Sequence, residues 1–84
     1  MPRVFVHTYR AHNNDWENDY YDFSRVPNKA ELIALSSKSP WFQVELVVHI
    51  PFEEDLAAEI YAVEVDREKV KMRKLNIKPA IEFE

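Results

Sequence analysis

The fold of this 84-residue chain is decided by the stretch Trp41-Phe-Gln-Val-Glu-Leu-Val-Val-His-Ile50. Every second side chain in it is apolar: Phe42, Val44, Leu46, Val48 and Ile50. Because successive side chains of a strand point to opposite faces of a sheet, a period of two places these five on one face. The stretch therefore predicts a central strand.

Two further segments, residues 3–9 and 58–66, alternate in the same way and are expected to form the other central strands. The aromatic residues 20–26 indicate a weaker strand. Between them, the Asn- and Asp-rich residues 11–19 lack any period and indicate a loop that carries an exposed Trp16. The chain thus has at least three segments with strand character and a polar connection after the first.

Two segments allow either a helix or a strand. Asn28 lies three residues before Glu31, as in a capping box, and the residues that follow favour a helix, whereas Leu32–Leu35 also suits a short strand. Residues 53–71 begin with carboxylates, as many helices do, but β-branched and aromatic residues at 60–65 favour a strand.

We therefore predict one mainly-β domain spanning residues 1–84, a small barrel or a curved antiparallel sheet. It should contain a turn or short helix at 66–71. The tail should add an edge strand with alternating apolar residues, namely Leu75, Ile77, Ile81 and Phe83. The alternative is an α+β fold with a helix at 28–37 or 53–71.

The chain contains no glycine and no cysteine. Without cysteine there is no disulfide, no thiolate metal site and no cysteine nucleophile. Without glycine, the glycine-rich phosphate loop, the dinucleotide-binding fingerprint and the Gly-x-Ser-x-Gly nucleophile elbow are excluded. Asparagine and proline must form the turns instead, and the hairpin loops should be longer than the two-residue turns that depend on glycine.

The composition is that of a globular, mildly acidic protein, with 46% hydrophobic residues and a net charge of −4. Its longest apolar run, residues 41–52, is interrupted by polar side chains and is shorter than the roughly 20 residues of a membrane helix. The first residues alternate and lack the apolar segment of a signal peptide. We expect a cytoplasmic protein with no membrane contact.

Three stretches together resemble a known pattern: Arg25-Val-Pro-Asn-Lys-Ala-Glu-Leu-Ile-Ala-Leu35, Trp41–His49 and Ala58–Val65. The pattern is that of uncharacterised small bacterial and phage β-barrel proteins, in which an Arg-x-Pro-x-x-Gly-Glu segment opens a strand and a Trp-Tyr-x-Val-type strand ends near a histidine. The resemblance covers about half of the chain and implies an SH3-like or related small barrel without any activity. The sequence departs from the pattern at Ala30, which stands in place of the glycine.

Aromatic and basic residues gather between residues 9 and 25. Tryptophan, tyrosine and arginine are the side chains that most often anchor protein interfaces, so we expect a protein partner or a second copy of the chain to bind at four of them. These candidates are Trp16, Tyr20, Tyr21 and Arg25. Four carboxylates in the same span would repel phosphates, namely Asp15, Glu17, Asp19 and Asp22.

Charge is divided unevenly along the chain, which supports an alternative. Residues 1–66 carry five basic and 12 acidic side chains, whereas residues 67–78 carry six basic and one acidic. The alternative is a nucleic-acid-binding small barrel that combines stacking with this basic run. Its candidate residues are Tyr9, Arg10, Arg67, Lys69, Lys71, Arg73 and Lys74.

Catalysis is not expected, because no hydroxyl lies in a motif with a base and an oxyanion donor. A metal-dependent hydrolase is a distant third hypothesis. It would need two imidazoles from His7, His12 and His49 to meet a carboxylate, and their spacing matches no metal-binding pattern. We therefore expect no metal, no cofactor and no enzymatic activity.

Overall fold

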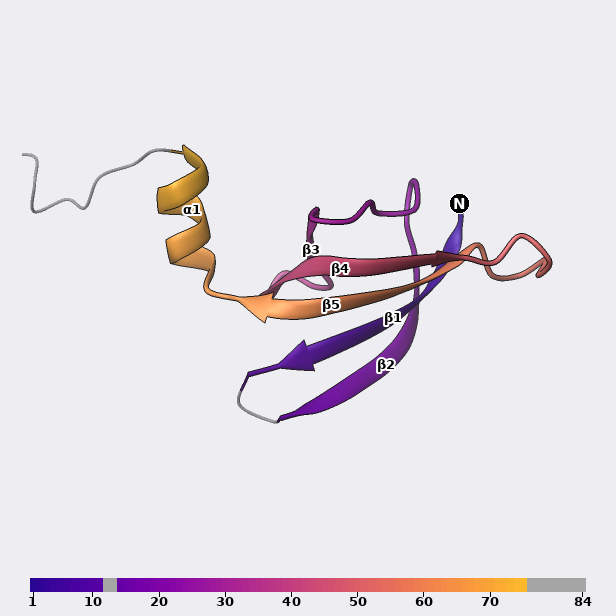
Figure 1. Cartoon of the computed structure of the whole chain (residues 1–84), viewed down its shortest axis with the longest axis horizontal. Helices are drawn as coiled ribbons and strands as arrows, with labels where there is room; N and C mark the ends of the chain where they lie inside the picture. Colours follow the sequence, from indigo (N-terminus) through magenta and orange to yellow (C-terminus); the bar gives the residue numbers. More distant parts are fainter. Residues whose placement is uncertain (12–13, 76–84) are drawn as a thin grey trace, which may run out of the picture.

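The computed structural model describes residues 1–11 and 14–75, which form one curled five-stranded sheet followed by a helix (Figure 1). The elements are β1 (Arg3–Arg10), β2 (Asp15–Asp22), β3 (Leu32–Ala34), β4 (Trp41–His49), β5 (Ala58–Val65) and α1 (Arg67–Leu75). Across the sheet the order is β2-β1-β5-β4-β3. β1 and β5 run parallel, and the other three neighbouring pairs are antiparallel. The mainly-β prediction is confirmed, with one parallel pair that the expected antiparallel sheet did not include.

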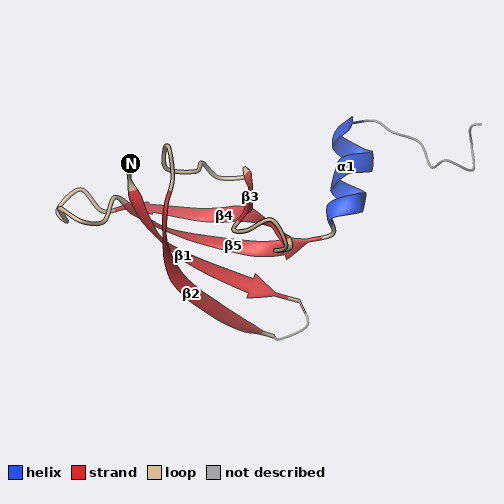
Figure 2. Ribbon diagram, turned by 180° about the vertical axis from the view of Figure 1, so that it is seen from behind, coloured by secondary structure: helices blue, strands red, loops and turns tan. Residues whose placement is uncertain are grey.

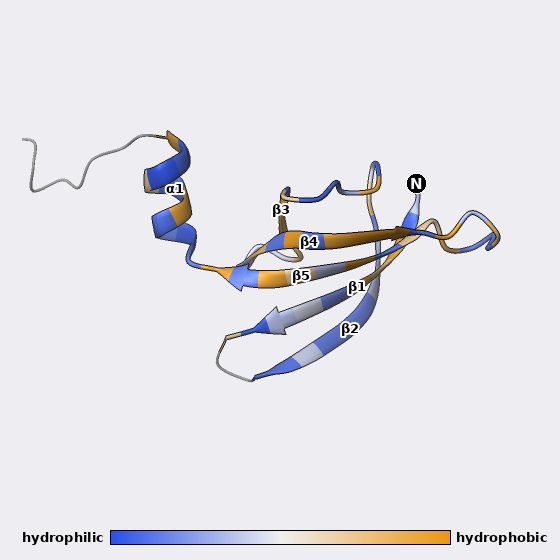
Figure 3. Ribbon diagram, in the orientation of Figure 1, coloured by the Kyte–Doolittle hydropathy of each residue, from blue (hydrophilic) through white to orange (hydrophobic). Residues whose placement is uncertain are grey.

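The strands predicted at 3–9, 41–50 and 58–66 are confirmed. The loop expected at 11–19 is wrong, because β2 begins at Asp15 and ends at Asp22, before the end of the strand expected at 20–26. β2 is polar along most of its length (Figure 3), and as an edge strand it pairs on one side only. An edge position leaves such side chains in water, so a polar sequence forms a strand there.

Neither alternative helix forms. Residues 28–37 contain the short strand β3, and although the Asn28 N–H bonds to Glu31 Oε1 at 2.5 Å as a capping box would, the chain turns at Ala30 and pairs with β4. In the range 53–71, β5 occupies the middle and α1 begins only at Arg67. The helix expected within 66–71 continues to Leu75, so Leu75 does not belong to the edge strand expected in the tail. The other residues of that expected strand lie outside the described residues.

Aspartate starts the helix. Asp66 Oδ1 accepts hydrogen bonds from the N–H groups of Glu68 and Lys69 at 3.0 and 3.1 Å, which satisfies two free donors of the first turn. Basic residues in the last turn, Arg73 and Lys74, suit the negative end of the helix dipole. Within the described part of the chain, no helix is long and apolar enough to cross a bilayer.

The core lies on one face of the sheet. Its buried residues come from β1, β4 and β5: Val4, Val6, Phe42, Val44, Ala58, Ile60 and Ala62. Partly buried side chains from the segments that join β2 to β3 and β3 to β4 pack against them, including Phe23, Val26 and Leu35. These segments lie over that face of the sheet (Figure 2). The face of the sheet opposite the core is therefore available as a functional surface.

A β-bulge in β4 changes which residues reach that core. The register between β4 and β5 shifts between Val44 and Leu46. Beyond the shift Val47 packs against the core, whereas Leu46 and Val48 are 58% and 47% exposed. The expectation that Phe42, Val44, Leu46 and Val48 share one face is therefore wrong, because one extra residue reverses the alternation.

The prediction of long hairpin loops is confirmed. The strand pairs close at Arg10 with Asp15, at Ala34 with Trp41 and at His49 with Ala58, so none of the three connections is a two-residue turn.

Candidate functional site

The face of the sheet opposite the core carries a band of large side chains, which we term the open face. Strand register and alternation assign it Phe5, His7 and Tyr9 from β1, Trp16, Asn18 and Tyr20 from β2, Glu59, Tyr61 and Val63 from β5, and Leu46 and Val48 from β4. The connecting segments pack on the other face (Figure 2), and Tyr20 and Trp16 remain 55% and 42% exposed.

Rings on the open face touch one another in a continuous series. Its members are Tyr20, Phe5, His7, Tyr61, Trp16 and Tyr9. Phe5 and Tyr20 stack with ring centroids 4.6 Å apart, and His7 and Tyr61 stack at 4.4 Å. Such pairs contribute about 0.5–1.5 kcal/mol beyond their buried area. The series therefore holds exposed rings in fixed positions, which suits them to bind another surface.

A polar network that includes two of these rings holds the centre of the series in place. His7 Nδ1 lies 2.5 Å from Asn18 Oδ1, and His7 Nε2 lies 2.6 Å from Glu59 Oε1. The Tyr61 hydroxyl donates to the same Glu59 oxygen at 2.9 Å. The hydrogen bond from His7, together with that from Tyr61, lowers the pKa of Glu59, and the bond to Glu59 raises the pKa of Tyr61.

His7 is a positioning residue in this arrangement. Both ring nitrogens face an oxygen acceptor, and the side chain is only 13% exposed between Phe5 and Tyr61. A histidine that is satisfied on both nitrogens and largely covered has no free nitrogen for a substrate.

The basic helix lies at one end of the sheet. The Arg67 guanidinium carbon is 5.8 Å and Lys71 Nζ is 5.6 Å from the centroid of the Trp41 ring. Cations at this distance from an indole ring are attracted to its face. These contacts join α1 to the first residue of β4.

The structure divides the four residues expected to bind a protein partner. Trp16 and Tyr20 lie together on the open face, whereas Tyr21 lies on the opposite face and packs against the core. Arg25 lies in the segment after β2, where its guanidinium makes two hydrogen bonds to Glu31 at 2.8 and 2.5 Å.

Apart from Tyr9, which the nucleic-acid alternative named, sequence reasoning did not assign the other members of the open face to a binding surface. The alternation of β1 already placed Phe5, His7 and Tyr9 on one side of the strand, so three neighbouring rings were a detectable signal. Tyr61 was detectable only as a strand residue, because nothing in one sequence brings β5 beside β1.

The nucleic-acid candidates are also divided. Tyr9 lies on the open face, but Arg10 lies on the other face, where its Nε is 2.9 Å from Glu17 Oε1. The remaining five belong to α1: Arg67, Lys69, Lys71, Arg73 and Lys74. Arg67 and Lys71 contact Trp41, and the other three are exposed to solvent on the helix.

Among the residues considered for a metal site, His7 and His49 lie apart. His49 pairs with buried Ala58 and so faces the core side of the sheet, whereas His7 is on the open face, and His12 lies outside the described residues. Among residues 1–11 and 14–75 there is no group of three histidine, aspartate or glutamate side chains close enough to hold a metal ion.

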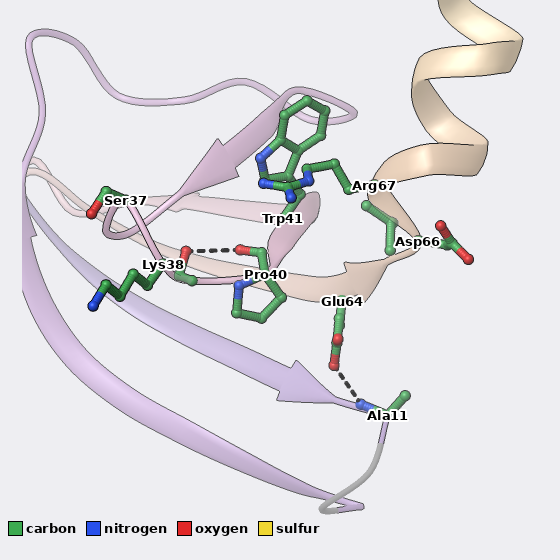
Figure 4. Close-up of a pocket in the computed structure, with 10 residues that line it drawn as sticks. Ala11, Ser37, Lys38, Pro40, Trp41, Glu64, Asp66 and Arg67 are labelled. Atoms are coloured by element: carbon green, nitrogen blue, oxygen red, sulfur yellow. Dashed lines mark hydrogen bonds between the residues drawn. The ribbon is translucent and has the colours of Figure 1, made fainter.

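A cavity of about 680 Å³ lies beside the end of β5 (Figure 4). Its titratable groups do not converge: Glu64 accepts a hydrogen bond from the Ala11 N–H at 3.0 Å, Arg67 lies by Trp41, and Lys38 extends away from both. An acid and base pair requires groups within reach of a common atom. This cavity is therefore a weaker candidate than the open face.

Comparison of the chain with protein-family models, with curated proteins and with solved structures found no match. The resemblance to small bacterial and phage barrels stays an expectation, and the open face is the feature from which a function can be argued.

Proposed function

We propose that this chain is a non-enzymatic binding module that recognises a protein partner through the open face. The observation that carries the proposal is the series of touching, partly exposed rings held by the network of His7, Glu59 and Asn18. Tryptophan and tyrosine anchors that are already ordered lose little conformational entropy when they bind, which is the usual property of interface hot spots.

The charges along the β2 edge of the sheet favour a protein over a nucleic acid, although Asp15, Glu17 and Asp19 lie on the face of β2 opposite the rings. The strand that carries Trp16 and Tyr20 also carries Asp15, Glu17, Asp19 and Asp22, and only Asp22 and Glu17 have ion-pair partners within the described chain. A phosphate backbone laid along β2 would meet this negative edge. A neutral or basic protein segment would not.

Nucleic acid is the second candidate, favoured by the position of α1. Its cations lie next to Trp41, so a strand that stacked on the sheet could reach positive charge at that end. Its affinity for a single-stranded oligonucleotide would fall steeply with salt.

The proposal can be tested by selecting displayed peptides on the wild-type protein and measuring their affinity for variants. Tyr20→Ser and Trp16→Ser should each weaken the selected peptides by roughly 30-fold or more, as expected for hot-spot anchors. Asp19→Ser is the matched control, since it changes the same strand on the opposite face, and it should bind the peptides like the wild type.

Circular dichroism would first establish that each variant folds. Peptides that bind wild type, Tyr20→Ser and Trp16→Ser equally would overturn the assignment of the open face. Salt-sensitive binding of oligonucleotides without any peptide selection would favour the nucleic-acid candidate instead.

A further inference from the structure

One half of β4 has a free edge. β3 pairs with β4 only at residues 41–43. The next residue, Val44, is paired on that side by Ala30 and Glu31, with N···O distances of 2.7 and 2.9 Å. Beyond Val44, no residue of the described chain bonds to the outer edge of β4, and the edge ends at Pro51, which has no N–H to donate. The free edge therefore spans residues 45–49.

The direction of its backbone groups follows from the bonds on either side. Val44 bonds outward, whereas the Ile50 N–H bonds to the Ala57 carbonyl on the β5 side at 3.0 Å. Bonding direction alternates along a strand, so counting back from Ile50 makes Val48 and Leu46 bond toward β5. Val47 and His49 then direct their N–H and C=O groups outward, where they have no partner among residues 1–11 and 14–75.

The side chains at this edge are apolar on the open face. The bulge turns Leu46 and Val48 outward, at 58% and 47% exposed. A free edge flanked by exposed apolar side chains is a template for another strand. The opposite edge of the sheet, β2, differs, because self-pairing there would bring carboxylates together.

We propose that two copies of this chain pair antiparallel through residues 45–49 of β4, with Val47 opposite Val47 of the second copy. This register places outward-directed residues opposite one another, as an antiparallel ladder requires. It also places Glu45 opposite the second copy's His49, and Leu46 opposite the second copy's Val48. Each of these pairs occurs twice because the contact is two-fold symmetric.

Backbone hydrogen bonding selects this register over its neighbour. Centring the pair on Val48 would place Glu45 opposite Pro51, which cannot donate to the ladder. Centring it on Val47 ends the ladder where Ala30 and Glu31 already occupy the edge at Val44. The paired sheets would be continuous, with two open faces side by side.

The test is light scattering and sedimentation of the full chain over a concentration series up to about 1 mM, the weakest range of a specific complex. The wild type should dimerise as concentration rises. Glu45→Lys should weaken the dimer roughly tenfold or more, since at both symmetric places it replaces the carboxylate facing His49 by an ammonium, which cannot accept a hydrogen bond from the imidazole N–H. The double variant Glu45→Lys with His49→Glu should restore the affinity to within about threefold of the wild type, because a carboxylate again faces a hydrogen-bond donor at both places.

Two further variants separate this contact from general effects of charge or folding. Glu53→Lys makes the same charge change on an exposed loop residue and should leave dimerisation unchanged. Val47→Pro removes the outward N–H and should abolish the dimer while circular dichroism stays that of a folded sheet. In the wild type, amide exchange at Val47 and His49 should slow as concentration rises.

A chain that stays monomeric throughout the series would overturn the proposal, as would a dimer whose affinity is insensitive to Glu45→Lys or is not restored by the charge exchange. Trp16→Ser lies on the open face away from the edge and should dimerise normally. The two proposals fail separately: peptides that still bind Trp16→Ser would overturn the first, and a chain that never dimerises would overturn only the second.

Discussion

At the scale of single residues, the chain shows how it turns without glycine. Within the described part of the chain, two residues have positive φ angles, Asn14 at 52° and Ala30 at 74°. Asparagine adopts this region readily, whereas alanine is strained there by its Cβ. Ala30 therefore occupies a backbone position that would suit glycine better than alanine.

Ala30→Gly should therefore stabilise the protein by about 1 kcal/mol, since glycine removes the Cβ strain that outweighs its own entropy. Urea denaturation followed by circular dichroism measures the change. The control is Ala34→Gly in β3, where the backbone is extended and glycine should destabilise. A stability for Ala30→Gly at or below that of the wild type would contradict the argument.

The same turn is held by a carboxylate. Glu31 accepts two hydrogen bonds from Arg25 and one from the Asn28 N–H, and these bonds lower the pKa of Glu31 from 4.5 to about 2. A lowered pKa in the folded state stabilises the protein above pH 4.5, and this stabilisation is lost as the pH falls toward 2.

We accordingly expect Glu31→Gln to melt below the wild type at pH 6, with the difference shrinking between pH 4.5 and 2. Thermal melts across this range measure it. Glu53→Gln, on an exposed loop with no ion pair in the described residues, should show no such trend. A melting difference for Glu31→Gln that is constant with pH would exclude the ion pair as its source.

At the scale of elements, β4 shows what a sequence can and cannot reveal. The period of two in its sequence predicted the strand and its length, because apolar and polar residues alternate along most of it. Its bulge was not predictable, since Val47 and Val48 are both apolar and either can face the core. The exposed edge at Leu46 and Val48 follows only once that choice is known.

β2 and β3 were harder to predict for a different reason. Tyr20 and Trp16 lie in a strand because they pair with Phe5 and Tyr9 of the neighbouring β1. That pairing cannot be seen from the local sequence of β2. The helix-like residues 29–35 become a short strand because Ala30 and Glu31 bond to Val44. In both cases tertiary pairing overrides local propensity.

Helix α1 is an element whose stability can be tested alone, since it extends from the end of the sheet (Figure 1). Asp66→Ala removes the cap and should destabilise the helix by about 1 kcal/mol. Amide exchange within α1 should accelerate while that of β1 and β5 stays the same. Asp55→Ala, in the exposed loop before β5, is the control, and slower or unchanged exchange in Asp66→Ala would rule out the cap.

At the scale of the whole molecule, stability depends on a thin core. A single layer of mostly small side chains lies between the sheet and the segments that cover it, and Phe42 is the largest of those fully buried. A small domain has a total stability of only about 5–15 kcal/mol. One large side chain therefore accounts for a sizeable share of it.

Phe42→Ala should lower the free energy of unfolding by about 3–5 kcal/mol, enough to unfold much of the protein near room temperature. Phe52→Ala is the matched control, because Phe52 is 81% exposed and should contribute little. Urea denaturation of both variants compares them directly. Equal effects of the two substitutions would mean that the core is not where the structure places it.

The parallel pairing of β1 with β5 has a consequence for synthesis on the ribosome. Val4 pairs with Ala58, so β1 leaves the exit tunnel well before β5, the strand that bonds its inner edge. Pairings so distant in sequence form slowly, and an unpaired strand is prone to aggregate in the interval. The nascent β1–β2 hairpin has one edge lined by aspartate and glutamate during that wait. Like charges on β2 oppose the pairing of this edge with the same edge of another chain.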